Sequence, residues 1–234
     1  MEKPQVPIKS KLKYIINMKR QGVIFDLDGT LTDTLGDIAA SMNKALEKHG
    51  FPTLDTTEYK DKVGWGLRRL AELCLPQDAR KDDIAAAVAE DAALFYIETP
   101  LVFTVVYPGI LGLVAELKRR KIKTAVLSNK NDPTTQIVIS SLFPPGSFDI
   151  VQGEVNGKPR KPDPASVWDL LVELKLTPSD VIFAGDSEID IETAVTSGCF
   201  PLGVSWGYRS RETIMDAGAR HIIDKPDELL LLLK

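Results

Sequence analysis

Residues 22–31 read Gly-Val-Ile-Phe-Asp-Leu-Asp-Gly-Thr-Leu, a short apolar run that ends in two aspartates and a glycine. Apolar residues without polar alternation are typical of a parallel strand that is covered on both faces. The two acids at its end, Asp26 and Asp28, repel one another and lose hydration, so they need a cation or a shared proton. Buried acids of this kind concentrate at functional sites, and we therefore expect chemistry at the end of this strand.

Short apolar runs alternate with stretches of helical period over most of the chain. Further strands are predicted at 122–127, 148–151, 181–185, 201–205 and 221–223, and helices at 110–120, 133–142, 164–174, 191–197 and 211–217. This alternation predicts the α/β class, with a Rossmann-like parallel sheet that carries helices on both faces.

Residues 35–105 break the alternation, because apolar residues recur there at helical spacing over 37–48, 57–73 and 81–97. A helical insert of this size directly after a strand predicts a small cap domain on two linkers. The alternative is that these helices pack on the same core. We expect a core made of residues 21–34 and 106–234, and a helical cap made of residues 35–105.

The composition is that of an ordinary globular protein of 234 residues, with 44% apolar and 26% charged residues. The net charge of −4 argues against nucleic acid or an anionic membrane as the main partner. No apolar run is long enough to cross a bilayer, and residues 1–20 form a basic extension without the apolar stretch of a secretory signal. The two cysteines, Cys74 and Cys199, lack metal-type spacing, which favours a reduced, cytoplasmic protein.

Several predicted strands are followed by polar residues that suit a cation and an anion. They are Asp26 and Asp28 after the first strand, Ser128-Asn129-Lys130 after the second, Lys161 in a Lys-Pro-Asp-Pro turn, and Asp186 with Asp190 after the fourth. Because ligands bind outside the carboxyl ends of parallel strands, we expect these residues to meet at one edge.

The predicted edge site combines carboxylates with a hydroxyl and a lysine. Carboxylate ligands without a nearby histidine or thiol suit Mg²⁺, which would reduce the electrostatic repulsion among Asp26, Asp28 and Asp186. Ser128 and Lys161 would then hold the oxygens of a phosphate.

With these motifs the chain resembles the haloacid dehalogenase superfamily of phosphatases, and within it the phosphoglycolate phosphatase-like group. The resemblance covers nearly everything after Arg20 and rests on four motifs in order: 26–31, 128–130, 161–162 and 185–190. It implies a magnesium-dependent phosphatase that acts on a small phosphorylated metabolite through an aspartyl-phosphate.

The resemblance also implies roles for individual residues. Asp26 matches the nucleophile, and Asp28 the general acid that later serves as base. The implied Mg²⁺ ligands are Asp26, Asp186 and the backbone carbonyl of Asp28, and Asp190 either assists the metal or orients Lys161. The phosphate and substrate contacts that we expect are Ser128, Asn129, Thr30 and Lys161, with Lys158 a competing assignment for the lysine.

The insert matches the mobile cap of the family, which closes over the substrate. Within it, the stretch 63–68 is the predicted specificity loop, and Arg68 would meet a substrate carboxylate. The alternative is an exposed arginine at a helix N-terminus. We interpret the segment 206–209 as a surface turn after a strand.

Other functions are also compatible with these motifs. A phosphosugar mutase of the β-phosphoglucomutase type shares the acid pair, and related caps also suit pyrophosphate. A non-catalytic phosphate-binding module is less favoured because every catalytic position is filled, and dehalogenase chemistry is disfavoured because it has no use for Asp28. The sequence leaves both a monomer and a homodimer possible.

Overall fold

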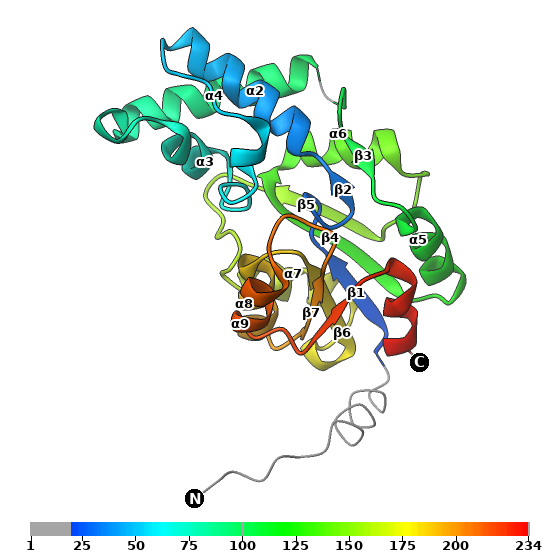
Figure 1. The fold of residues 1–234 in the computed structure, drawn as a ribbon. Coiled ribbons are helices and arrows are strands. Elements are labelled where there is room, and N and C mark those ends of the chain that lie inside the picture. Colours follow the sequence, from blue (N-terminus) through cyan, green and yellow to red (C-terminus); the bar gives the residue numbers. More distant parts are fainter. Residues whose placement is uncertain (1–19, 100, 234) are drawn as a thin grey trace, which may run out of the picture.

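The computed structural model describes residues 20–99 and 101–233, so the predicted basic extension lies, except for Arg20, outside the described residues. The chain builds a six-stranded sheet in the order β5-β4-β1-β6-β7-β8, and every neighbouring pair is parallel (Figure 1). The strands are β1 (Gly22–Phe25), β4 (Lys123–Asn131), β5 (Ile150–Glu154), β6 (Val181–Gly185), β7 (Phe200–Val204) and β8 (His221–Ile223).

Helices cover both faces of this sheet, as the alternating pattern predicts. One face packs against α5 (Ile110–Arg119), α6 (Asp132–Leu142) and the 3₁₀ turns of η4 (Pro226–Leu232), and the other against α7 (Ala165–Leu174) and α8 (Glu188–Ser197). Successive side chains of β1 point to opposite faces of the sheet. Val23 therefore packs in the hydrophobic core on the first face, and Ile24 in the core on the second. A short helix, α9 (Arg211–Asp216), joins β7 to β8. The predicted α/β class is confirmed.

The strand order places a topological switch point between β1 and β6. From β1 the chain builds β4 and β5 on one side, and then returns to β6 on the other. The carboxyl ends of β1 and β6 are therefore adjacent, and the N–H of Asp26 donates to the carbonyl of Ala184 at 3.0 Å. Ligands of open parallel sheets bind at such a crevice.

Residues 35–104 form a helical lobe beside this edge of the sheet, at the top of Figure 1. The lobe contains α2 (Leu35–Lys48), α3 (Leu67–Cys74), α4 (Asp82–Glu98) and two short 3₁₀ turns, η1 (Thr56–Tyr59) and η2 (Gln77–Ala79). Its two connections to the sheet run side by side as an antiparallel pair, β2 (Thr32–Asp33) and β3 (Val105–Val106).

The predicted single helix over 57–73 is wrong. The chain leaves η1 after Tyr59 and enters α3 only at Leu67. Gly64 and Gly66 have φ of +121° and +84°, a backbone region that interrupts a right-handed helix. The residues between form a loop, 60–66, which we call the lobe loop.

The two connections to the lobe are tied together by Asp37, a buried residue of α2. Its carboxylate accepts the backbone N–H groups of Val102, Phe103 and Thr104 at 2.8–3.1 Å. The start of the lobe is thus fixed to its end. No helix of the described residues is long and apolar enough to span a membrane.

The packing of α7 gives a prediction about stability. Leu171 is 3% exposed against the sheet, whereas its neighbour Val172 is 80% exposed. We expect Leu171→Ala to lower the free energy of unfolding by about 2–5 kcal/mol, because it leaves a cavity in the core. The matched change Val172→Ala should stay within about 0.5 kcal/mol. Urea unfolding measures both, and equal losses would contradict the orientation of this helix.

Candidate active site

A cavity lies between the carboxyl end of the sheet and the helical lobe. The sheet contributes its polar wall, which includes Asp26, Asp28, Ser128, Lys161, Asp186 and Asp190. The lobe contributes an apolar wall with Ile38, Leu67 and Leu70. A cavity with an apolar wall and a few convergent polar groups is typical of a small-molecule site.

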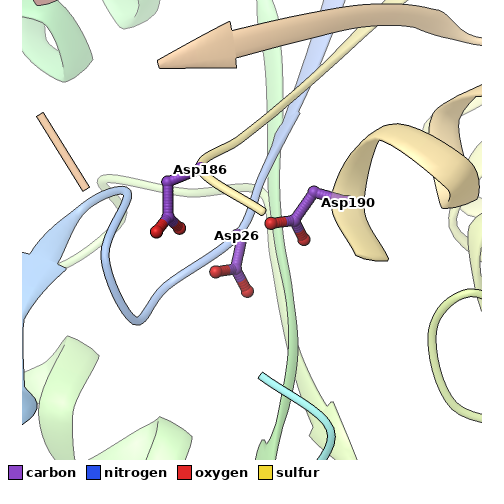
Figure 2. Close-up of side chains that lie close together, drawn as sticks. All are labelled: Asp26, Asp186 and Asp190. Carbon is purple, nitrogen blue, oxygen red and sulfur yellow. The ribbon is translucent and has the colours of Figure 1, made fainter. Parts of the chain in front are cut away.

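Three buried carboxylates converge at the floor of the cavity (Figure 2). Asp26 follows β1, Asp186 follows β6 and Asp190 lies in the first turn of α8, and each offers an oxygen within 4.8 Å of the other two. The ammonium of Lys161 joins two of them, because its Nζ donates to Asp26 Oδ1 at 2.6 Å and to Asp190 Oδ1 at 2.7 Å.

The structure brings Lys161, and not Lys158, to the carboxylates. The side chain of Lys161 is 3% exposed, whereas that of Lys158 is 56% exposed and lies 3.9 Å from Asp169. The amide of Asn129 fixes the Lys161 backbone, since its Oδ1 accepts from the Lys161 N–H and its Nδ2 donates to the Lys161 carbonyl, both at 3.0 Å.

Burial and neighbouring charges shift the pKa values of Asp26, Asp186 and Lys161. Burial raises the pKa of Asp26 well above its usual range, the charge of Asp190 adds to this, and Lys161 opposes it. Burial, followed by the charge of Asp190, raises the pKa of Asp186 to about 7. Burial lowers the pKa of Lys161, but Asp190 and Asp26 outweigh it and hold that pKa above its usual value. The raised pKa values show that the ionised acids lack sufficient positive charge beside them, and an all-oxygen set of this kind fits a hard divalent cation.

Asp186 is held by contacts that turn its carboxylate toward the other two acids. Thr30 Oγ1 donates to its Oδ1 at 3.0 Å, and the backbone N–H of Tyr208 donates to its Oδ2 at 2.8 Å. The backbone passes so close that a Cβ on Gly207 would lie 2.2 Å from the Cβ of Asp186. Thr30, predicted to contact substrate, instead holds a candidate metal ligand.

Asp190 is fixed by the helix start on which it lies. The Ser187 N–H donates to Asp190 Oδ2 at 3.1 Å and the Asp190 N–H donates to Ser187 Oγ at 3.4 Å, which makes a capping box at the N-terminus of α8. The Ser187 hydroxyl also donates to Asp190 Oδ2 at 2.6 Å. The other oxygen of Asp190 is free to accept from Lys161. We expected Asp190 either to assist the metal or to orient Lys161, and its hydrogen bond with the Lys161 ammonium fits the second role.

The Asp28 carboxylate lines the same cavity but has different partners. It accepts from Thr34 Oγ1 at 2.6 Å and from Lys130 Nζ at 3.0 and 3.1 Å. Lys130 is itself nearly buried and lies 4.6 Å from the ring centre of Tyr96, which comes from α4 of the lobe. Lys130 belongs to one of the four motifs, but no sequence signal points to this pairing, which spans 102 residues.

Two groups at the cavity keep capacity for a ligand. The Ser128 hydroxyl accepts the N–H of Lys130 at 3.1 Å, which leaves its own proton for a ligand oxygen. The Tyr96 hydroxyl is buried and makes no hydrogen bond to any residue that the structure describes, although Lys130 and Thr104 lie nearby. A buried hydroxyl of this kind usually has a partner, so it can meet a polar atom of a substrate.

The structure does not bring Arg68 to the cavity. Its side chain is 57% exposed and lies 3.6 Å from Asp82, which agrees with the alternative of an exposed arginine at a helix N-terminus. Because α3 begins at Leu67, the residues three apart, Leu67 and Leu70, face the cavity, and Arg68 points elsewhere.

The segment 206–209 is not the surface turn that we expected. Trp206 Nε1 donates to the carbonyl of Thr30 at 3.0 Å, and Tyr208 contacts both Asp186 and the first connection to the lobe. Arg209 reaches the lobe loop. Most of these contacts join residues more than a hundred positions apart in the chain, so the local composition of the segment does not predict them.

The lysine at the centre of the acids gives the second prediction. Lys161→Ala leaves the buried carboxylates without their shared cation, and we expect the metal-free variant to lose about 3–5 kcal/mol of unfolding free energy. Lys161 lowers the pKa of Asp26, so its removal raises that pKa further, and at low pH a bound proton partly replaces the missing cation. The loss should therefore be smaller at about pH 6 than at about pH 8.

Denaturant unfolding in a chelator measures this loss, with Lys158→Ala as the matched control that should change little. A loss that is equal at the two pH values, or equal in the two variants, would contradict the charge assignment.

Known proteins are similar to this chain in both sequence and fold. The profile of the haloacid dehalogenase-like hydrolase family matches residues 23–204. The chain is 34% identical over 212 residues to the phosphoglycolate phosphatase of Rhodospirillum rubrum, which covers 87% of each protein. It is 32% identical over 186 residues to the phosphoglycolate phosphatase of Aquifex aeolicus, which covers 80% of this chain and 85% of that protein.

Among solved structures, a protein of Lactobacillus delbrueckii subsp. bulgaricus, provisionally described as a phosphoglycolate phosphatase, has a TM-score of 0.84 and 31% identity. That match covers 91% of this chain and 97% of the other. The predicted superfamily is therefore confirmed, and the chain belongs to the haloacid dehalogenase-like hydrolases.

Proposed function

We propose that the protein is a Mg²⁺-dependent phosphatase that hydrolyses a small phosphorylated metabolite through an aspartyl-phosphate on Asp26. The observation that carries this proposal is the convergence of Asp26, Asp186 and Asp190 with Lys161 at the switch point of the sheet. The family and the curated relatives support the same reaction.

The first step is attack by the Asp26 carboxylate on the phosphorus. The bond between phosphorus and the leaving oxygen breaks, and Asp28 gives that oxygen its proton. Lys161 and the Ser128 hydroxyl hold the phosphoryl oxygens, where negative charge spreads in the transition state. In the second step Asp28 takes a proton from water, the water attacks the phosphorus, and phosphate leaves Asp26.

Mg²⁺, when bound, adds positive charge beside the phosphoryl oxygens and offsets the repulsion among the acids. The residues that would hold it are Asp26, Asp186 and the backbone carbonyl of Asp28. Asp190 keeps Lys161 in place beside them.

The substrate class is inferred from the cavity and the relatives. Proteins similar to this chain are phosphoglycolate phosphatases, and we infer a phosphoglycolate-like ester of small size. Tyr96 and Lys130 line the cavity, and both can donate to a carboxylate or hydroxyl oxygen of the leaving group. The helical lobe acts as the cap that excludes water. Cys74 and Cys199 are both free, which fits a reducing cytoplasm.

A panel of phosphate esters with a colorimetric phosphate assay tests the class of reaction. Phosphate release from phosphoglycolate supports the proposal. Isomerised sugar phosphate without free phosphate would instead identify a mutase, release from pyrophosphate alone would identify a pyrophosphatase, and absence of any turnover with Mg²⁺ would indicate a phosphate-binding module.

The different roles proposed for Asp26 and Asp28 give the third prediction. With p-nitrophenyl phosphate, whose leaving group needs no proton, we expect Asp28→Asn to release a burst of about one nitrophenolate per enzyme, because phosphoryl transfer occurs but its hydrolysis stalls. Asp26→Asn should show no burst and no turnover. Rapid-quench kinetics measures both variants, and a burst in Asp26→Asn would place the nucleophile elsewhere.

Metal binding gives the fourth prediction. Since the pKa of Asp186 is raised to about 7, a proton competes with the metal below that pH. We expect Mg²⁺ affinity to fall about tenfold per pH unit as the pH drops below about 7, as measured by calorimetry. Asp186→Asn should bind weakly at every pH.

A chelator should stop hydrolysis, and Ca²⁺ should inhibit it because of its larger and looser coordination shell. Full hydrolysis in excess chelator, or an affinity that does not change with pH, would contradict the metal assignment.

A further inference from the structure

The guanidinium of Arg209 joins the sheet domain to the lobe loop. Arg209 follows β7, yet its NH2 donates to the carbonyl of Val63 at 2.7 Å and to that of Asp61 at 3.4 Å, and its NH1 donates to the carbonyl of Lys60. The side chain is only 7% exposed. Three backbone carbonyls of one loop thus converge on one cation that lies 146–149 residues away in the chain.

A carboxylate next to the catalytic acids holds Arg209 in this position. Its Nε donates to Glu188 Oε2 at 3.1 Å, and Glu188 is the first residue of α8, two positions after Asp186. The preceding residue, Tyr208, contacts Asp186 through its N–H and accepts the N–H of Thr34 through its hydroxyl at 2.9 Å. One short segment therefore contacts a candidate metal ligand, the connection to the lobe and the lobe loop.

The lobe loop meets the sheet domain at a second point close by. Asn129 Nδ2 donates to the carbonyl of Gly64 at 2.9 Å, and the same amide group holds the Lys161 backbone. The backbone at Gly64 approaches α8 so closely that a Cβ there would lie 2.9 Å from Ile189 Cδ1. The loop is thus seated against the site.

We propose that Arg209, oriented by Glu188, is a positioning residue that locks the lobe loop over the cavity and so stabilises the closed state in which phosphoryl transfer occurs. The kinetic part of this proposal rests on the proposed phosphatase function, whereas the structural part does not. Arginine suits the role because one planar fork serves a carboxylate and several carbonyls at once. A lysine in its place keeps the charge but has no fork of that geometry.

The test uses the full chain with Arg209→Lys and Arg209→Gln. The matched control is Arg211→Gln, which removes an arginine two residues later whose exposed side chain pairs with Asp224, away from the cavity. Hydrogen–deuterium exchange of the peptide that contains residues 60–66 reports the seating of the loop without any substrate. Steady-state kinetics with phosphoglycolate and Mg²⁺ reports its consequence, and thermal unfolding reports global stability.

We expect exchange over 60–66 to speed up about tenfold in Arg209→Gln and less in Arg209→Lys, with exchange in the central strands unchanged. The ratio kcat/KM should fall by a similar factor, first through a higher KM, because less of the enzyme–substrate complex is closed. Arg211→Gln should match the unaltered protein in both measurements.

Two other outcomes overturn the proposal. If kcat/KM falls but exchange over 60–66 does not change, Arg209 contacts substrate directly, since it also lines the cavity. If exchange rises throughout the protein together with a lower melting temperature, Arg209 has only a structural role. Faster exchange confined to 60–66 in a protein without phosphatase activity would sustain the lock and refute the proposed function, so the two failures are distinguishable.

Discussion

The Lys161 ammonium and the three buried carboxylates around it set the physical constraint on which the rest of the molecule depends. Asp26, Asp186 and Asp190 lie within 4.8 Å of one another, and the Lys161 ammonium contacts two of them. Removal of carboxylates from water is costly, and mutual repulsion adds to the cost. A fold that retains such a cluster must supply fixed donors around it and must leave room for a further cation.

The surrounding elements supply those donors from several directions. The strand order brings Asp26 and Asp186 together at the switch point, Ser187 holds Asp190 through a capping box, and Thr30 with the Tyr208 N–H holds Asp186. These partners hold the acids where they are before any ligand enters. Preorganisation of this kind favours catalysis because little reorganisation remains for the transition state.

Much of this architecture could be predicted from the sequence, because its signals are local. Buried parallel strands have a recognisable composition, and the residues directly after each strand lie at a common edge of the sheet. The positions of Asp26, Asp28 and Asp186 are therefore predictable from the pattern, whereas Ser128 lies within β4, which continues past its predicted end to Asn131. The choice of Lys161 over Lys158 rests on the Lys-Pro-Asp-Pro turn, and the structure places Lys161 alone of the two at the acids.

The residues whose contacts could not be predicted from the sequence are those whose surroundings depend on distant parts of the chain. Arg68 is exposed because two glycines with positive φ delay the start of α3 and turn its apolar side to the cavity. Thr30 contacts Asp186 instead of the cavity, and Arg209 contacts a loop 146–149 residues away. Neither contact is predicted by the spacing of apolar residues or by the local composition, so both are visible only in the folded structure.

The central claim is that Asp26 is the nucleophile of a site that Asp186 and Lys161 complete. Its most direct test is a crystal structure with Mg²⁺ and beryllofluoride, which mimics a phosphoryl group on a carboxylate. We expect a beryllium–oxygen bond to Asp26, a metal ion bound by Asp26 and Asp186, and Lys161 Nζ within hydrogen-bond distance of a fluoride. An adduct on Asp28 or Asp190, or a metal ion bound without Asp186, would contradict it.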